Sequence, residues 1–180
     1  MKILAFAASN SSQSINKQLV EYSKQLIESG LIEGAQVEVL DINDYEMPLY
    51  SSDREEAGGI PQLAHDFKAK IEQADALVVS FAEHNGSYTA AFKNLFDWTS
   101  RIDMAVYQNT PTVMLATSPG KGGAANVLNT AKTSAPYFGG NVVADLSVAE
   151  FYNVFDSEAG ELTDEGYNQQ LKQALQALVS

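Results

Sequence analysis

The amino-acid sequence predicts an α/β fold in which a parallel five-stranded sheet carries helices on both of its faces. Five short segments are almost continuously apolar, and a segment with helical spacing follows each of them. Strands that alternate with helices are joined by right-handed crossovers, which make the sheet parallel. Strands that are apolar on both sides belong to a sheet that is buried on both faces. The chain therefore predicts three layers: helices, sheet and helices.

The expected elements follow one another in a regular order. We expect strands at residues 2–8, 36–42, 76–82, 111–117 and 141–148, and helices at residues 14–29, 62–73, 88–100, 122–137 and 164–179. In the first helix, Ile15, Leu19 and Tyr22 form one apolar stripe, and Gly30 marks its end. The second helix repeats this spacing. Five strands in a chain of 180 residues suit the order 2-1-3-4-5 of a flavodoxin-like three-layer sandwich.

The helix expected at residues 88–100 is apolar around more of its circumference than one stripe requires. Phe92, Leu95, Phe96 and Trp98 together cover more than one amphipathic stripe. Two interpretations stay open: the helix packs entirely within the core, or one of its sides packs against a second subunit. Ser87 is the expected N-cap of this helix.

Two stretches of the chain have no clear periodicity. Residues 43–61 are polar and irregular, which indicates a lid or interface loop rather than a domain boundary. Residues 150–160 are acidic and aromatic, and we expect them to pack on the surface. Neither stretch has the composition of an interdomain linker, so we expect one domain over residues 1–180.

Composition excludes several classes of function. Lys and Arg total 11 against 23 Asp and Glu, and the formal net charge is −12. Such a surface repels nucleic acids and anionic membranes. The chain has no cysteine, which excludes disulfides, thiolate chemistry and Cys-ligated metals. The longest apolar run is too short for a membrane span, and the N-terminal run is too short for a signal peptide, so we expect a cytoplasmic protein.

The first candidate site is a hydroxyl-rich loop between the first strand and the first helix. Ser9, Ser11, Ser12 and Ser14 lie there. Ligands of such sheets bind beyond the carboxyl ends of the strands, where the strand order reverses, and this loop is one of three that meet there. A helix N-terminus with added hydroxyl donors suits a phosphate, although Ser is also an ordinary capping residue. GxGxxG and GxxxxGK[ST] motifs are absent from the sequence.

Two further loops reach the same point. Residues 82–87 turn polar directly after a buried strand, and Asn85-Gly86 is a turn pair that exposes backbone amides. Residues 117–123 contain three glycines, which allow a flat ligand to approach the backbone closely. His84 has only His65 as a histidine partner in the whole chain, so a histidine metal site has little support, and we expect no metal.

These loops resemble the motifs of a known enzyme family. AEHNGSYTAAFKNLFDW, residues 82–98, resembles the PEYNxSxPxxLKNxxDW signature of the NADPH-dependent FMN reductases. ASNSSQSIN, residues 8–16, is similar to their GSxRxxSxN phosphate loop, and SPGKGG, residues 118–123, is similar to their Ser-x-Gly-x-x-Gly-Gly loop. The chain departs from the family at three positions, where Ser11, Ala82 and His84 replace Arg, Pro and Tyr.

The resemblance implies bound FMN, NADH or NADPH as the electron donor, a small-molecule electron acceptor such as a flavin or quinone, and homodimers or homotetramers. Carried over by position, it makes Ser9, Ser14 and Asn16 phosphate ligands, with Ser11 contributing a hydroxyl in place of the lost guanidinium. It places Glu83, His84, Asn85 and Gly86 beside the isoalloxazine ring, and Ser118, Gly120, Gly122 and Gly123 at its other edge.

We therefore expect an FMN-dependent NAD(P)H oxidoreductase in which the protein binds and orients the flavin and supplies no side-chain acid or base. Backbone amides of residues 120–123 and the start of the following helix are expected to stabilise the charge of reduced FMN. One alternative is a flavodoxin-like electron carrier, because the loop at Ser9, Ser11 and Ser14 also resembles the flavodoxin phosphate loop. Another is a vestigial fold without flavin, which purified protein would reveal by its lack of yellow colour with FMN.

Overall fold

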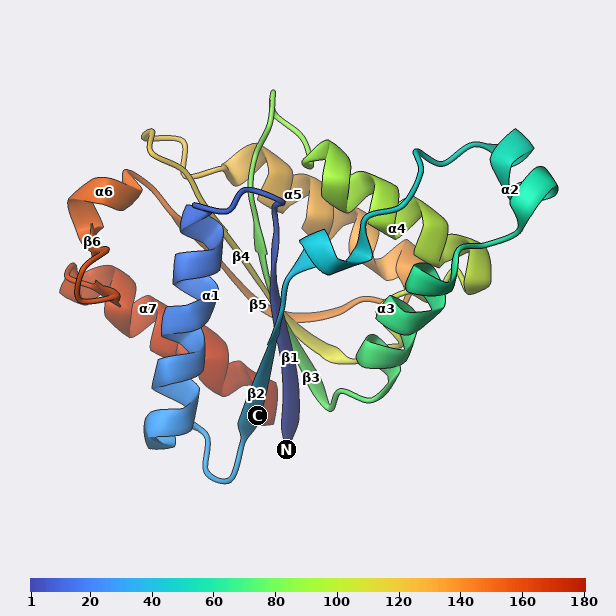
Figure 1. The fold of residues 1–180 in the computed structure, drawn as a ribbon. Helices are drawn as coiled ribbons and strands as arrows, with labels where there is room; N and C mark the ends of the chain where they lie inside the picture. The colour runs from blue at the N-terminus through green and yellow to red at the C-terminus, as the bar shows by residue number, and fades with distance from the viewer.

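A parallel five-stranded sheet forms the centre of the molecule (Figure 1). The computed structural model describes all 180 residues. The strands are β1 Lys2–Ala8, β2 Gln36–Leu40, β3 Ala76–Phe81, β4 Pro111–Thr117 and β5 Asn141–Val148. Their order is β2-β1-β3-β4-β5, and every neighbouring pair is parallel. This confirms the predicted flavodoxin-like sandwich.

The helices cover the sheet in two layers (Figure 1). One layer holds α1 Ile15–Leu26 and α7 Glu165–Gln176, and the other holds α3 Gln62–Glu72, α4 Ala90–Ile102 and α5 Ala125–Ser134. On β1, Ile3 and Ala5 belong to the hydrophobic core between the sheet and α1 and α7. Leu4 and Phe6 belong to the core between the sheet and α3, α4 and α5. Since side chains alternate along a strand, burial on both faces produces the continuous apolar runs seen in the sequence.

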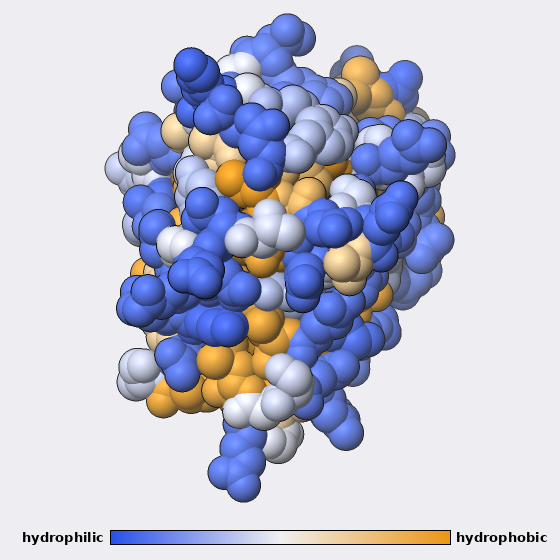
Figure 2. All heavy atoms as spheres, turned by 90° about the vertical axis from the view of Figure 1, so that its left-hand side faces the viewer, coloured by the Kyte–Doolittle hydropathy of each residue, from blue (hydrophilic) through white to orange (hydrophobic).

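The helices α1, α5 and α7 each continue into a turn of different geometry. α1 is followed by a wider turn at Ile27–Leu31, in which Gly30 has φ 108°. α5 continues into a 3₁₀ turn at Ala135–Phe138, and α7 into one at Ala177–Val179. The face that carries α1 and α7 is largely hydrophilic (Figure 2), as expected of helices that bury one stripe. None of the helices has the length and apolar character that crossing a membrane requires.

The segment after β2 contains structure that the sequence did not indicate. β2 ends at Leu40, because the Asp41 carboxylate accepts a hydrogen bond from the Asn43 amide and starts a 3₁₀ turn at Ile42–Tyr45. A short helix, α2 Ser52–Gly58, then stands away from the body of the molecule (Figure 1). None of its residues is buried. It therefore has no apolar periodicity from which it could be predicted.

Core packing accounts for the apolar circumference of α4. Phe92 is buried against Phe6 and Phe81, and Trp98 is 1% exposed. The Trp98 indole donates to the Pro48 carbonyl at 2.7 Å, so the loop after β2 covers the second side of the helix. The argument from this helix for a second subunit therefore does not hold. Its N-cap is Thr89 rather than Ser87, because Ser87 closes a turn with His84.

Residues 150–160 form a small structural unit rather than a surface coil. They comprise α6 Phe151–Val154 and β6 Phe155–Asp156, which pairs with β7 Glu161–Leu162. The rings of Phe151 and Phe155 stack at 4.5 Å and are buried. Tyr152 between them is 65% exposed, so only part of this stretch packs on the surface as expected.

Candidate functional site

A cleft of about 220 Å³ lies at the carboxyl ends of β1, β3 and β4. Seven of the predicted residues line it: Ser9, Ser11, Ser14, Asn16, Glu83, His84 and Ser118. Asn85, Gly86, Gly120, Gly122 and Gly123 belong to the same loops but do not line this cleft. Sites that enclose a whole drug-sized ligand usually measure about 300–1,000 Å³. The cleft is therefore large enough for only part of an FMN-sized ligand.

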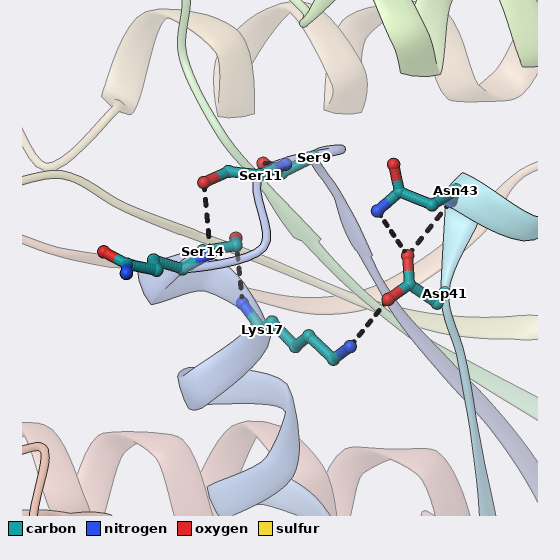
Figure 3. A network of polar contacts seen from close by, with 7 residues as sticks. Ser9, Ser11, Ser14, Lys17, Asp41 and Asn43 are labelled. Carbon is teal, nitrogen blue, oxygen red and sulfur yellow. Dashed lines mark hydrogen bonds and ion pairs between the residues drawn. The ribbon is translucent and has the colours of Figure 1, made fainter.

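The serines of the first loop keep their hydroxyl hydrogens free. Ser9 Oγ accepts from the Ser11 amide at 3.3 Å, and Ser11 Oγ accepts from the Gln13 amide at 3.3 Å. Ser14 Oγ accepts from the Lys17 amide at 3.2 Å and is the N-cap of α1 (Figure 3). A hydroxyl that accepts in this way still has one hydrogen to donate. Capping and anion binding are therefore compatible at Ser14.

Backbone amides at the start of α1 are also free. The N–H groups of Ser12, Ile15 and Asn16 have no acceptor within the chain, and the first turn of α1 contains no acidic residue. An α-helix carries partial positive charge at this end, which favours a phosphate. These donors fit the phosphate of FMN.

The Asn16 side chain is held by three hydrogen bonds within the chain. It is 2% exposed, donates to the Thr117 carbonyl at 3.3 Å and accepts from the Thr117 amide at 3.2 Å. It also accepts from Ser80 Oγ at 2.8 Å. These bonds use Oδ1 twice and one of the two Nδ2 hydrogens, so the second Nδ2 hydrogen and the backbone N–H remain to meet a ligand.

The cation of this segment, Lys17, is already paired. Its ammonium lies 2.7 Å from the Asp41 carboxylate, which also accepts from Asn43 (Figure 3). The hydrogen bond that Lys17 donates to Asp41 raises the pKa of Lys17 and lowers the pKa of Asp41. With Ser11 in place of the family's Arg, the free donors that the first loop offers to an anion are neutral hydroxyls and backbone amides.

The second loop is a tight turn that presents two amides. His84 and Ser87 exchange backbone hydrogen bonds of 3.0 and 3.1 Å, and Asn85 and Gly86 both have positive φ angles, 52° and 77°. The Asn85 and Gly86 amides have no acceptor within the chain. The turn predicted from this residue pair is confirmed.

The glycines of the third loop differ in their roles. A Cβ on Gly120 or Gly122 would meet nothing within 4 Å, which leaves space for a ligand. A Cβ on Gly123 would lie 2.3 Å from Ser147 Oγ, and the φ of Gly123 is 57°. Gly123 is therefore required for packing against β5, whatever binds at the loop.

Sequence reasoning missed Tyr152 as a residue of the cleft. Two backbone bonds fix its position: the Phe151 amide donates to the Ser118 carbonyl at 3.1 Å, and the Glu150 amide donates to the Gly120 carbonyl at 3.0 Å. Its position directly after β5, at the same edge of the sheet, was the available signal. An exposed aromatic ring there contributes to the wall of the cleft.

Comparison with known proteins identifies the family. A sequence model of the NADPH-dependent FMN reductases matches residues 1–153. The chain belongs to this family. The NADPH:quinone oxidoreductase of Arabidopsis thaliana is 31% identical over 150 residues, which are 82% of this chain and 74% of the relative. The NAD(P)H:quinone oxidoreductase of Solanum tuberosum is 28% identical over 181 residues, 99% of this chain and 91% of the relative.

Among solved structures, the flavoenzyme NAD(P)H:(acceptor) oxidoreductase FerB of Paracoccus denitrificans matches with a TM-score of 0.75 and 25% identity. The match covers 99% of this chain and 94% of FerB. Family membership confirms FMN as the cofactor and NAD(P)H as the donor. The protein is an NAD(P)H-dependent oxidoreductase.

The Asn16 side chain yields a prediction about stability. Asn16→Ala removes three interior hydrogen bonds, so we expect a loss of about 3 kcal/mol in the free energy of unfolding, at about 1 kcal/mol each. Urea denaturation of the flavin-free protein measures it. Asn10→Ala, at an exposed position of the same loop, is the control and should change little. A loss below about 1 kcal/mol for Asn16→Ala would contradict the prediction.

Two variants of Ser14 separate capping from phosphate binding. Ser14→Ala should cost about 1 kcal/mol of stability as a lost cap. It should also weaken FMN binding roughly 10- to 150-fold, as a lost hydrogen bond to a charged group. Ser14→Asp keeps a good cap but repels the phosphate, so its stability should match the wild type while FMN binding falls. Riboflavin binding should change little in both. Fluorescence titrations and thermal melts measure these effects, and a Ser14→Asp variant with wild-type FMN affinity would refute the role.

Proposed function

We propose that this protein reduces quinones with electrons from NAD(P)H, through FMN held by the three loops at the carboxyl edge of the sheet. The observation that carries the assignment is the set of free donors on these loops, within a chain that belongs to an FMN-dependent family. The relatives from Arabidopsis thaliana and Solanum tuberosum are both named as quinone oxidoreductases, which favours a quinone as the acceptor.

Each loop has a separate task in this proposal. The free amides at the start of α1 and the hydroxyls of Ser9, Ser11 and Ser14 bind the phosphate. The amides of Asn85 and Gly86 and the loop at Ser118–Gly122 orient the isoalloxazine ring. FMN held there would supply the redox chemistry, namely hydride transfer from NAD(P)H and electron transfer to the acceptor. No side chain is assigned as a proton donor or acceptor.

The proposal extends to assembly and location. We propose a homodimer or homotetramer, as the family resemblance implies. Leu49, 68% exposed in the loop that covers Trp98, is a candidate contact between subunits. An apolar side chain exposed to this degree gains by burial in an interface. We place the protein in the cytoplasm, where NADH and NADPH are available.

Anaerobic mixing tests the reaction. NADPH or NADH should bleach the absorbance of protein-bound FMN within seconds, and an added benzoquinone should restore it without any second protein. Reoxidation should be absent in the control without quinone. If bleaching requires a separate reductase protein, the chain is an electron carrier and the proposal is wrong.

Sedimentation velocity at micromolar concentration tests the assembly. We expect a dimer or tetramer for the wild type, and dissociation toward monomer for Leu49→Asp, because the new charge would be desolvated in the interface. Val179→Asp, at an exposed apolar position near the C-terminus, is the control and should leave the assembly unchanged. A purely monomeric wild type would refute the oligomer.

A further inference from the structure

Glu83 connects the second of the three loops to the helix that follows the third. It lies in the loop that follows β3, and its side chain turns toward the start of α5. Oε2 accepts from the Val127 amide at 2.9 Å, and Oε1 accepts from Asn126 Nδ2 at 3.2 Å. A carboxylate from the second loop therefore occupies the N-terminus of the helix that follows the third loop.

α5 depends on this remote carboxylate because it lacks a cap of its own. Its N-cap residue, Ala124, has no side chain to cap with and has a φ of 60°, and its first turn contains no acidic residue. The helices α1, α2, α4 and α7 are instead capped by their own residues, namely Ser14, Ser51, Thr89 and Asp164. α5 is thus capped through a tertiary contact that crosses the site.

The charge of Glu83 has no cationic partner. Glu83 forms none of the salt bridges of the molecule, and its neighbours at α5 are a neutral amide and an asparagine. It is half-buried and lines the cleft beside His84 and Ser118. A charge in such a position is screened less than one on the open surface.

This arrangement adds a contact that the sequence did not predict. The positive end of α5 was expected to stabilise the negative charge that FMN gains on reduction. In the structure, the Val127 amide already bonds to Glu83, and a full negative charge lies at that helix end. The nearby amides that have no acceptor within the chain, and so remain free, are those of Gly120, Lys121, Gly122, Ala124 and Asn126.

We propose that Glu83 is a positioning residue that holds the two ring-binding loops together and keeps the reduction potential of bound FMN low. This inference rests on the proposed function, in which these loops hold the isoalloxazine ring. The fixed carboxylate disfavours the more negative, reduced cofactor relative to the oxidised one. A lower potential makes the reduced enzyme a stronger donor to its acceptor.

Glu83→Gln tests the charge separately from the cap. A glutamine oxygen still accepts from the Val127 amide, so the urea midpoint of the flavin-free variant should match the wild type, whereas Glu83→Ala should unfold at lower urea. The measured quantity is the midpoint potential of bound FMN, from anaerobic titration against a reference dye. In Glu83→Gln, the affinity for reduced FMN should rise at least about tenfold relative to the affinity for oxidised FMN. For a two-electron couple, this is a rise of about 30 mV in the midpoint potential.

Glu33→Gln is the matched control. It removes one exposed carboxylate near the amino end of β2, at the opposite edge of the sheet, and should leave the potential unchanged. A potential in Glu83→Gln equal to that of the wild type would overturn the inference, as would equal weakening of oxidised and reduced FMN. If the wild type binds FMN and only the potential fails to move, the inference alone is wrong. A wild type that binds no FMN overturns the proposed function as well.

Discussion

The buried amide of Asn16 is the contact on which the geometry of the site depends. Its side chain bonds to both backbone groups of Thr117 at the end of β4 and to the hydroxyl of Ser80 in β3. Asn16 belongs to the first turn of α1, so the start of this helix is fixed against the ends of two strands. The phosphate loop on one side and the glycine loop on the other therefore begin from positions set by one side chain.

The contacts of the second and third loops leave several backbone amides without a partner. Glu83 connects the second loop to α5, while the carbonyls of Ser118 and Gly120 accept bonds from the segment that starts α6. Backbone groups without a partner in the folded chain have to bond to water or a ligand. At this edge of the sheet they include the amides at the start of α1, at Asn85-Gly86 and at residues 120–122. Their amides need no rearrangement to meet an anionic or planar ligand.

The parts of the fold that the sequence predicted are those whose signal is local. β4 and β5 have the bounds expected of them because both are short runs between turn residues, with β4 buried on both sides. α2 was missed because it buries nothing, and periodicity arises only from burial. The cap of α5 was missed because Glu83 and Val127 are 44 residues apart in the chain. The side-chain role of Asn16 was missed for the same reason, since its partner Thr117 is 101 residues away.

The proposal assigns binding and reduction of the flavin to different parts of this edge. In the proposed arrangement the first loop would meet the phosphate with amides and hydroxyls, and Ser11, in place of the family's Arg, would affect a group remote from the ring. A change there alters the affinity for oxidised and reduced FMN alike, because the phosphate has the same charge in both. Glu83 joins the second loop to the helix that follows the third, and both loops are assigned to the ring, where charge changes on reduction. An acidic chain can therefore lose a phosphate-binding cation and keep its redox properties, provided that the contact between the second loop and α5 is retained.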